Sequence, residues 1–280
     1  MRLFTCVTLA ASLSASPALA QRAAMPSPEQ LQDRDMVTIG VGPALVPDYE
    51  GSDDYRIIPA GALRAKIGGV SVTTNGPNVH VDVIPKRGSF NIDAGPIAGL
   101  RFDGRHRSDD PVVKLLPRRK TAIEVGGFAG VSFKGVVDPY DSLAFHVDVL
   151  HDIGNAHEST IISPNVSFST PLSRKTYVSL AGGADFAGSR YARYYFGITE
   201  EDVLRTGGAI PEFSPDGGLK DLKASLLVNQ SITGDLLGGF SVFGVGQYSR
   251  LAGDFKRSPI VSERGSASQW IAAAGLAYTW

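Results

Sequence analysis

The sequence predicts an all-β protein, a transmembrane antiparallel β-barrel of the outer-membrane type with about 12 strands. Three observations predict this fold. Apolar and polar residues alternate with a period of two from Met36 onward, the alternating segments are long, and the chain ends on an aromatic residue, Trp280. Because successive side chains of a strand point to opposite faces, a period of two indicates strands rather than helices.

The alternation is clearest in residues 140–151, YDSLAFHVDVLH. One face carries Leu143, Phe145, Val147 and Val149, and the other carries Ser142, Ala144, His146 and Asp148. The same division recurs in residues 89–102, 119–133 and 219–231. Each segment is therefore predicted to be a strand with one apolar and one polar surface.

Two kinds of fold contain such strands. A soluble β-sandwich turns its apolar faces inward, whereas a membrane barrel turns them outward to lipid. The segments here run for about 10 to 14 residues, whereas strands of soluble proteins average about five or six. The polar faces are rich in Gly, Ala and Ser with isolated charges, as expected of a crowded barrel lumen. Both features favour the barrel.

The predicted strands are residues 37–46, 55–67, 69–74, 78–84, 89–102, 119–133, 140–151, 158–170, 174–187, 219–231, 236–250 and 268–280. The connections between them alternate in length, and in outer-membrane barrels the short turns are periplasmic and the long loops face outward. Segments 69–74 and 78–84 are too short to span the membrane unless they pair as a partial hairpin. The expected count is therefore about 10 to 12 strands.

Residues 1–20 have the features of a secretory signal peptide. Arg2 supplies the positive start, an apolar stretch follows, and small residues precede a cleavage site near Ala20. The mature chain would then begin at Gln21.

The only cysteine, Cys6, lies inside this segment, so disulfides and thiol catalysis are excluded from the mature chain. A secreted chain of this length without cysteine indicates the envelope of a Gram-negative cell. Residues 21–35 are polar and contain proline, which fits either a short periplasmic lead-in or a disordered terminus. Residues 36–280 form the predicted barrel.

The last predicted strand carries aromatic residues on one face, Trp270, Tyr278 and Trp280. Such rings occupy the interfacial girdles of membrane barrels. The machinery that assembles outer-membrane barrels reads a terminal aromatic strand of this kind. The expected partners therefore include the barrel assembly machinery and outer-membrane lipid.

The longest outer loop contains YARYYFGITEEDVLRTGG, residues 191–208. Thr199 followed by three acidic residues predicts the start of a short helix, which the glycines at the end would stop. Tyr191, Tyr194, Tyr195 and Phe196 are expected to form part of the upper girdle and an anchor that folds the loop into the barrel mouth as a plug. A platform for a ligand is the alternative.

Charges of both signs are expected on the lumen faces of the strands. They are Arg56, Arg64, Asp93, Arg101, Glu124, His146, Asp148 and Asp185, with Lys66, Asp82, Asp221 and Lys223. Paired charges of this kind stabilise a filled barrel.

Signals for catalysis are weak in this set of residues. His146 and Asp148 share a face with Ser142, but four residues along one strand separate the serine by ~13 Å. The histidines and acids lack metal-ligand spacing. The formal net charge of −1 provides no basic field for nucleic acid. We expect a non-enzyme without metal or cofactor.

Three stretches together resemble the MipA/OmpV family of outer-membrane proteins, and the similarity covers essentially the whole mature chain. They are VPDYEGSDDYRIIP at residues 46–59, YARYYFGITEEDV at residues 191–203 and the C-terminal run from Tyr248. The resemblance implies location in the outer membrane. It also implies a scaffold that links a lytic transglycosylase to a penicillin-binding protein in peptidoglycan (murein) synthesis and remodelling, although other members are described as porin-like or antigenic.

Three functions therefore remain open: a scaffold for envelope enzymes, a narrow porin-like channel for small solutes, and a barrel-borne hydrolase. The scaffold is the expected function, with the channel as its main alternative. The short turns offer little surface to a periplasmic partner, and the lumen charges and long loop favour a plugged barrel over an open one.

Overall fold

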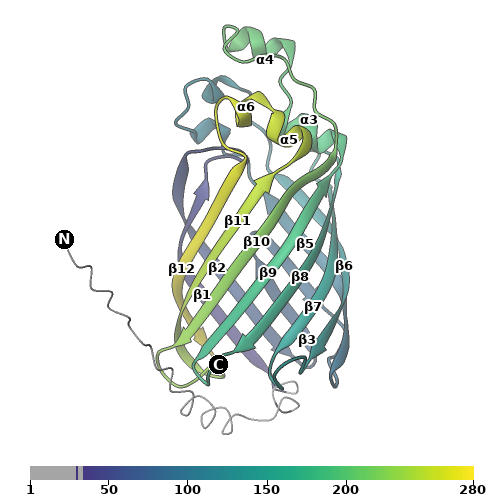
Figure 1. Cartoon of the computed structure of the whole chain (residues 1–280), viewed down its shortest axis with the longest axis vertical. Coiled ribbons are helices and arrows are strands. Elements are labelled where there is room, and N and C mark those ends of the chain that lie inside the picture. The colour runs from purple at the N-terminus through teal and green to yellow at the C-terminus, as the bar shows by residue number, and fades with distance from the viewer. Residues whose placement is uncertain (1–29, 31–33) are drawn as a thin grey trace, which may run out of the picture.

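The computed structural model describes residue 30 and residues 34–280. Its antiparallel strands close into one barrel, because β1 pairs with both β2 and β12 (Figure 1). The predicted all-β barrel is therefore confirmed, including its 12 strands. The expected signal peptide, residues 1–20, and most of the expected lead-in lie outside the described residues.

The strands are β1 (Met36–Pro47), β2 (Tyr55–Ile67), β3 (Val70–Asn75), β4 (Asn78–Asp82), β5 (Phe90–Arg101), β6 (Ala122–Lys134), β7 (Ser142–Asp152), β8 (Thr160–Pro171), β9 (Thr176–Ala187), β10 (Gly218–Ser231), β11 (Gly239–Leu251) and β12 (Ser268–Thr279). Short helices lie in the loops: η1 (Arg105–Arg107), η2 (Val113–Leu115), α3 (Ser189–Phe196), α4 (Glu200–Arg205), α5 (Gly253–Arg257) and α6 (Pro259–Ser262). No helix of the described chain has the length and apolar character needed to cross a membrane.

The apolar faces of the strands point away from the lumen. In β7, Phe145, Val147 and Val149 are exposed on the outside, whereas Asp148 is buried on the inside. Exposed apolar side chains recur around the barrel, among them Ile39, Val41, Ile57, Ile92, Leu180, Leu222, Leu226, Val242 and Leu276. This outward band suits a lipid environment and is the reverse of a sandwich core, so the sandwich alternative is wrong.

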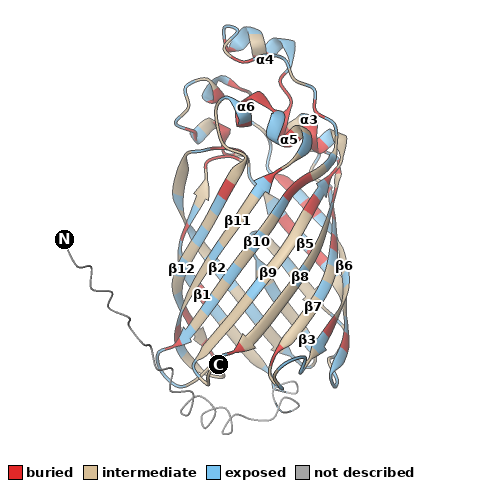
Figure 2. Cartoon of the chain, viewed as in Figure 1, coloured by how far each residue is buried: buried red, intermediate tan, exposed pale blue. Residues whose placement is uncertain are grey.

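The two ends of the barrel differ. The six helices named above lie at one end, and short turns close the other, where the C-terminus also lies (Figure 1). We call the helical end the cap and define it by residues 48–54, 102–121, 188–217 and 252–267. Figure 2 shows that burial concentrates in the cap and the adjoining barrel mouth. The main hydrophobic core of the protein is there.

The barrel wall has a gap beneath the cap. The β3–β4 hairpin is short, and β2 pairs with β3 only from Arg64 to Ile67. On the other side, β4 pairs with β5 from Asn78 to His80, and the Val83 N–H donates to the Ala94 carbonyl at 3.1 Å. The partial hairpin expected from the sequence is thus present, and the upper half of β2 has no strand partner on that side. Pro59, which has no N–H to donate, fits such an edge. We call this gap the notch.

Aromatic residues gather on the outside at both ends of β11 and β12. Near the C-terminus, the ring of Tyr278 lies 4.7 Å from that of Phe240 and 4.7 Å from that of Trp280. At the cap end, the rings of Tyr248 and Trp270 are 4.9 Å apart. Two such belts normally flank an apolar band about 25 Å tall.

Deleting residues 278–280 should lower the amount of folded barrel several-fold. The deletion removes two ring pairs worth about 0.5–1.5 kcal/mol each. It also removes the bond that the Trp280 N–H donates to the Val37 carbonyl, at 2.9 Å, across the seam between first and last strands. Gel mobility before and after boiling measures the folded fraction. Trp270→Ala, at the far end of the same strand, is the control that should fold better, and equal folded fractions for deletion and wild type would contradict the assembly role.

Candidate functional site

The aromatic stretch of the longest loop forms helix α3. Tyr191, Ala192, Tyr195 and Phe196 are its buried residues, and helical spacing places them on one face. These aromatics were predicted to precede a helix. The prediction is wrong in this respect, because they form a helix of their own. The helix expected from Thr199 is also present as α4. A full capping box closes its start, in which the Thr199 hydroxyl accepts from the Asp202 N–H at 3.2 Å.

Helix α3 packs into the core of the cap rather than facing lipid. Tyr191 and Phe196 are 0 % exposed, and the rings of Phe196 and Phe255 meet edge to face at 5.2 Å. The other buried members of this core are Tyr49, Val113, Leu116, Ile161, Ala187, Ala192, Tyr195, Ile198, Ile210, Leu251, Ile260 and Val261. A buried aromatic ring removes ~150–250 Å² from water, or roughly 4–6 kcal/mol gross at ~25 cal/mol per Å². Burial therefore places these rings as an anchor and not as a girdle.

Tyr194 is the least buried of the four predicted aromatics. Its hydroxyl accepts a hydrogen bond from the Lys120 N–H at 2.8 Å. The Arg119 guanidinium lies 5.0 Å from the centre of its ring. Tyr194 thus fastens α3 to the loop between β5 and β6.

Tyr191 occupies the centre of the barrel mouth. Its hydroxyl donates to Glu50 Oε2 at 2.6 Å, and Lys220 also pairs with Glu50. The cations of Arg101 and Lys220 lie 5.3 and 5.9 Å from the ring centre. Burial raises the pKa of Tyr191 well above its ordinary value, so the phenol stays a donor. Burial would raise the pKa of Glu50 too, but the charges of Lys220 and Arg101 outweigh it and hold that pKa below its ordinary value.

A β-bulge supplies the cation of this arrangement. The pairing of β10 with β9 shifts between Leu219 and Asp221, so that Lys220 and Asp221 are both buried in the mouth. Strict alternation would place Lys220 on the lipid face with Leu222. Lys220 was therefore not among the predicted lumen charges.

Lys220 extends the network into the lumen wall. It lies 2.8 Å from Asp221 and 3.4 Å from Asp185. Asp185 in turn pairs with Lys223 at 2.5 Å and accepts from the Ser163 hydroxyl at 2.6 Å. The structure thus brings three predicted lumen charges together beneath Tyr191.

A second ionic group also contacts Tyr191. Arg101 donates to both oxygens of Glu124, at 2.8 and 3.1 Å. His157 Nε2 lies 3.0 Å from Glu124, and its ring meets the Tyr191 ring edge to face at 5.0 Å. Arg101 and Glu124 were predicted as lumen charges. His157 was not, because it lies in the β7–β8 loop, outside the alternating pattern.

The remaining predicted lumen charges lie lower in the barrel, apart from Arg56, which is at the cap end of β2. Asp148 lies 3.1 Å from His80 and 3.9 Å from His146. Asp93 pairs with Lys86 at 2.5 Å. Within the described chain, Arg56 and Arg64 form no ion pair, and no serine hydroxyl bonds to either histidine. The same residues contain no group of three or more His, Cys, Asp or Glu that could hold a metal ion.

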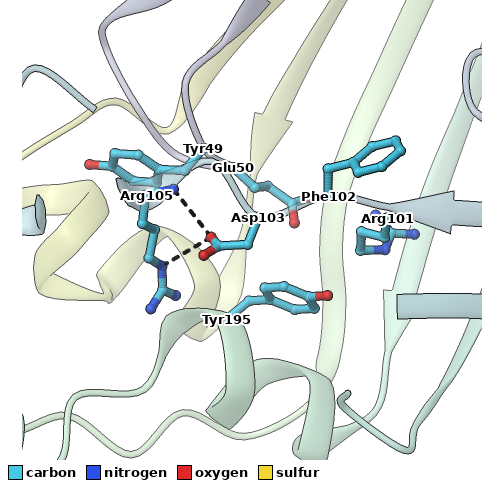
Figure 3. Close-up of a pocket in the computed structure, with 7 residues that line it drawn as sticks. All are labelled: Tyr49, Glu50, Arg101, Phe102, Asp103, Arg105 and Tyr195. Atoms are coloured by element: carbon cyan, nitrogen blue, oxygen red, sulfur yellow. Dashed lines mark hydrogen bonds and ion pairs between the residues drawn. The ribbon is translucent and has the colours of Figure 1, made fainter. Parts of the chain in front are cut away.

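The middle of the lumen is not tightly packed. On β10, Lys223, Ser225 and Asn229 keep partial exposure on the lumen face, whereas Asp221 and Ser231 at its two ends are buried. A separate pocket of about 100 Å³ lies in the mouth beside Tyr195, between the β1–β2 turn and the end of β5 (Figure 3).

Solved structures similar to this chain are outer-membrane barrels of low sequence identity. An outer membrane channel from Pseudomonas putida F1 has a TM-score of 0.44 and 8% identity, over 92% of this chain and 97% of its own. The CymD monoaromatic hydrocarbon channel has a TM-score of 0.39 and 10% identity, over 92% of each chain. A Pseudomonas aeruginosa FadL homologue has a TM-score of 0.34 and 11% identity, over 93% and 94%.

At these identities the likeness is one of fold alone. No curated protein matches the chain. One family model, described as MltA-interacting protein MipA, matches residues 39–280, from within β1 to the last residue. The resemblance drawn from the sequence is thereby confirmed: the chain belongs to the MipA family.

Proposed function

We propose that the protein is a scaffold of the Gram-negative outer membrane that binds a lytic transglycosylase at its periplasmic end. The family description supports this partner, because its members are named for interaction with MltA. A penicillin-binding protein is the second enzyme of the proposed assembly, which would place synthesis beside cleavage of peptidoglycan. The protein itself is not an enzyme in this proposal.

The buried core at the barrel mouth is the observation that supports the proposal. A general pore needs a continuous aqueous path, but here α3 and its buried neighbours cover the mouth and Tyr191 is bonded to Glu50 within it. The contact with a partner would then be made at the opposite, short-turn end of the barrel. Short turns are periplasmic in outer-membrane barrels, so the short-turn end would face the peptidoglycan.

One periplasmic turn is suited to contact a partner. Val137, between β6 and β7, is 86 % exposed. The buried Asp141 carboxylate holds the turn rigid by accepting the N–H groups of Val136, Val137 and Asp138 at 2.7, 2.8 and 2.8 Å. A fixed apolar projection loses little entropy on binding and fits a hydrophobic pocket of an enzyme.

A narrow channel is the second candidate. The partial exposure of Lys223, Ser225 and Asn229 supports it, because a hollow polar lumen conducts once its mouth opens. Arg64 and Lys66, on the lumen face of β2, would then meet solutes without competing carboxylate partners among the described residues. This function requires the cap to move.

Val137→Glu should weaken binding of the purified lytic transglycosylase by at least about tenfold, as expected when a charge replaces an apolar anchor. Surface plasmon resonance on detergent-solubilised barrel measures the affinity. Leu204→Glu is the matched control, because Leu204 is an exposed apolar residue of α4 at the other end. An equal loss of affinity in both variants, or no loss with Val137→Glu, would exclude this turn as the binding site of the enzyme. A wild-type barrel that does not bind would overturn the scaffold proposal itself.

Wild-type protein in planar bilayers should show little conductance, whereas Tyr191→Ala should open a measurable channel. The substitution removes the buried ring and its bond to Glu50 but leaves every strand pairing in place. Tyr191→Phe, which keeps the ring, should produce brief openings only. Tyr140→Phe, in a periplasmic turn, is the control. Strong conductance of the wild type would make the channel the primary function.

A further inference from the structure

Several buried donors in the cap and barrel mouth have no partner among the described residues. They are Nη1 and Nη2 of Arg105, Nε and Nη1 of Arg56, Nε of Arg119, Nε of Arg264 and the hydroxyl of Tyr195. Arg105 is 2 % exposed and Tyr195 is 6 % exposed. A buried guanidinium normally has an anion beside it, because leaving its charge and its N–H groups unmatched is costly.

Both of these side chains line the pocket of about 100 Å³ in Figure 3. Its lining consists of Tyr49, Glu50, Arg101, Phe102, Asp103, Arg105 and Tyr195. The segment after β5 forms one wall, the β1–β2 turn forms another, and α3 closes the third.

The carboxylates of the pocket are already engaged. Glu50 is held by Tyr191 and Lys220. Asp103 accepts the backbone N–H groups of Arg105 at 3.4 Å and Arg119 at 3.1 Å. Asp103 reaches Arg105 Nε only at 3.8 Å. The two terminal nitrogens of Arg105 therefore remain available.

Arg105 keeps its charge in this environment. Burial lowers its pKa to about 10, with the nearby charge of Arg119 acting in the same direction. That value is still far above neutral pH. A permanent cation with two free N–H groups is a bidentate receptor for oxyanions.

We propose that this pocket binds a phosphate or carboxylate group, with Arg105 as its principal ligand. The Tyr195 hydroxyl, which points toward Arg101 on the other side of the pocket (Figure 3), is a further donor to the same pocket. Arg101 adds positive charge from the pocket wall. A volume of about 100 Å³ admits a single oxyanion group and not a whole lipid or sugar. The pocket would thus recognise a single anionic group, irrespective of the molecule that carries it.

The pocket lies at the cap end of β5, which borders the notch. Phe102 directly follows β5, lines the pocket and is 63 % exposed. Gly104 then crosses to the β1–β2 turn so closely that a Cβ there would lie 1.5 Å from the Asp48 carbonyl oxygen and 2.8 Å from Arg56 Nη2. The oxyanion could accordingly come from a lipid headgroup entering through the notch or from a soluble phosphate.

Thermal unfolding of the folded full-length protein in neutral detergent tests the site. One arm adds inorganic phosphate against sodium chloride at equal ionic strength. The other compares mixed micelles containing dioleoyl phosphatidic acid with micelles containing dioleoyl phosphatidylcholine. The unfolding midpoint should rise with the phosphate ligand in at least one arm, and the arm that responds identifies the source.

Arg105→Gln should lower the affinity for the ligand that responds by at least about tenfold, since a hydrogen-bonded charge is lost. Tyr195→Phe should weaken it less and keeps the cap packing, so it tests the site even where Arg105→Gln unfolds the cap. Arg107→Gln, an exposed neighbour in η1, should bind like wild type. No rise in either arm would overturn the proposal, as would a rise that Tyr195→Phe and Arg105→Gln both retain.

Discussion

The hydrogen bond from the Tyr191 hydroxyl to Glu50, at 2.6 Å, connects the cap to the barrel beneath it. Glu50 belongs to the β1–β2 turn and Tyr191 to helix α3. Lys220, which also pairs with Glu50, belongs to the bulge in β10. Three segments far apart in the sequence thus meet at one partly buried point. The barrel would close without this contact, because its strands pair continuously around the seam, but the mouth would lack its fixed cover.

Packing and charge have different roles in the mouth. The apolar core around Phe196, Phe255 and Ile260 supplies most of the free energy that holds the cap, since each buried ring contributes several kcal/mol gross, roughly 4–6 by area. Buried ion pairs contribute little net stability, because desolvation offsets their attraction. What they supply here is position. Glu124 on β6 binds Arg101 and Asp185 on β9 binds Lys220, and these two cations lie 5.3 and 5.9 Å from the centre of the Tyr191 ring.

The alternation of residues was sufficient to predict the barrel, its strands and the inward direction of Arg101, Glu124, Asp148 and Asp185, because side-chain direction in a regular strand depends only on parity. The alternation predicted the wrong direction for Lys220, because the bulge inserts one residue there. It also could not find Glu50, His157 or Arg105, which lie in loops whose path is set by tertiary contacts. The aromatic run was predicted to form part of the girdle and an anchor. Its helical form was not expected, because Tyr and Phe have modest helix propensity and the burial of one face decides the outcome.

Hydrogen–deuterium exchange of α3 tests most directly whether the Tyr191–Glu50 contact fixes the cap. In the wild-type barrel, amides of residues 191–196 should exchange nearly as slowly as those of β10. Glu50→Gln should accelerate exchange in α3 and in residues 48–54 together, because both segments depend on the same contact, while β10 stays protected. Exchange of wild-type α3 as fast as that of the short periplasmic turns, or an α3 indifferent to Glu50→Gln, would contradict this account.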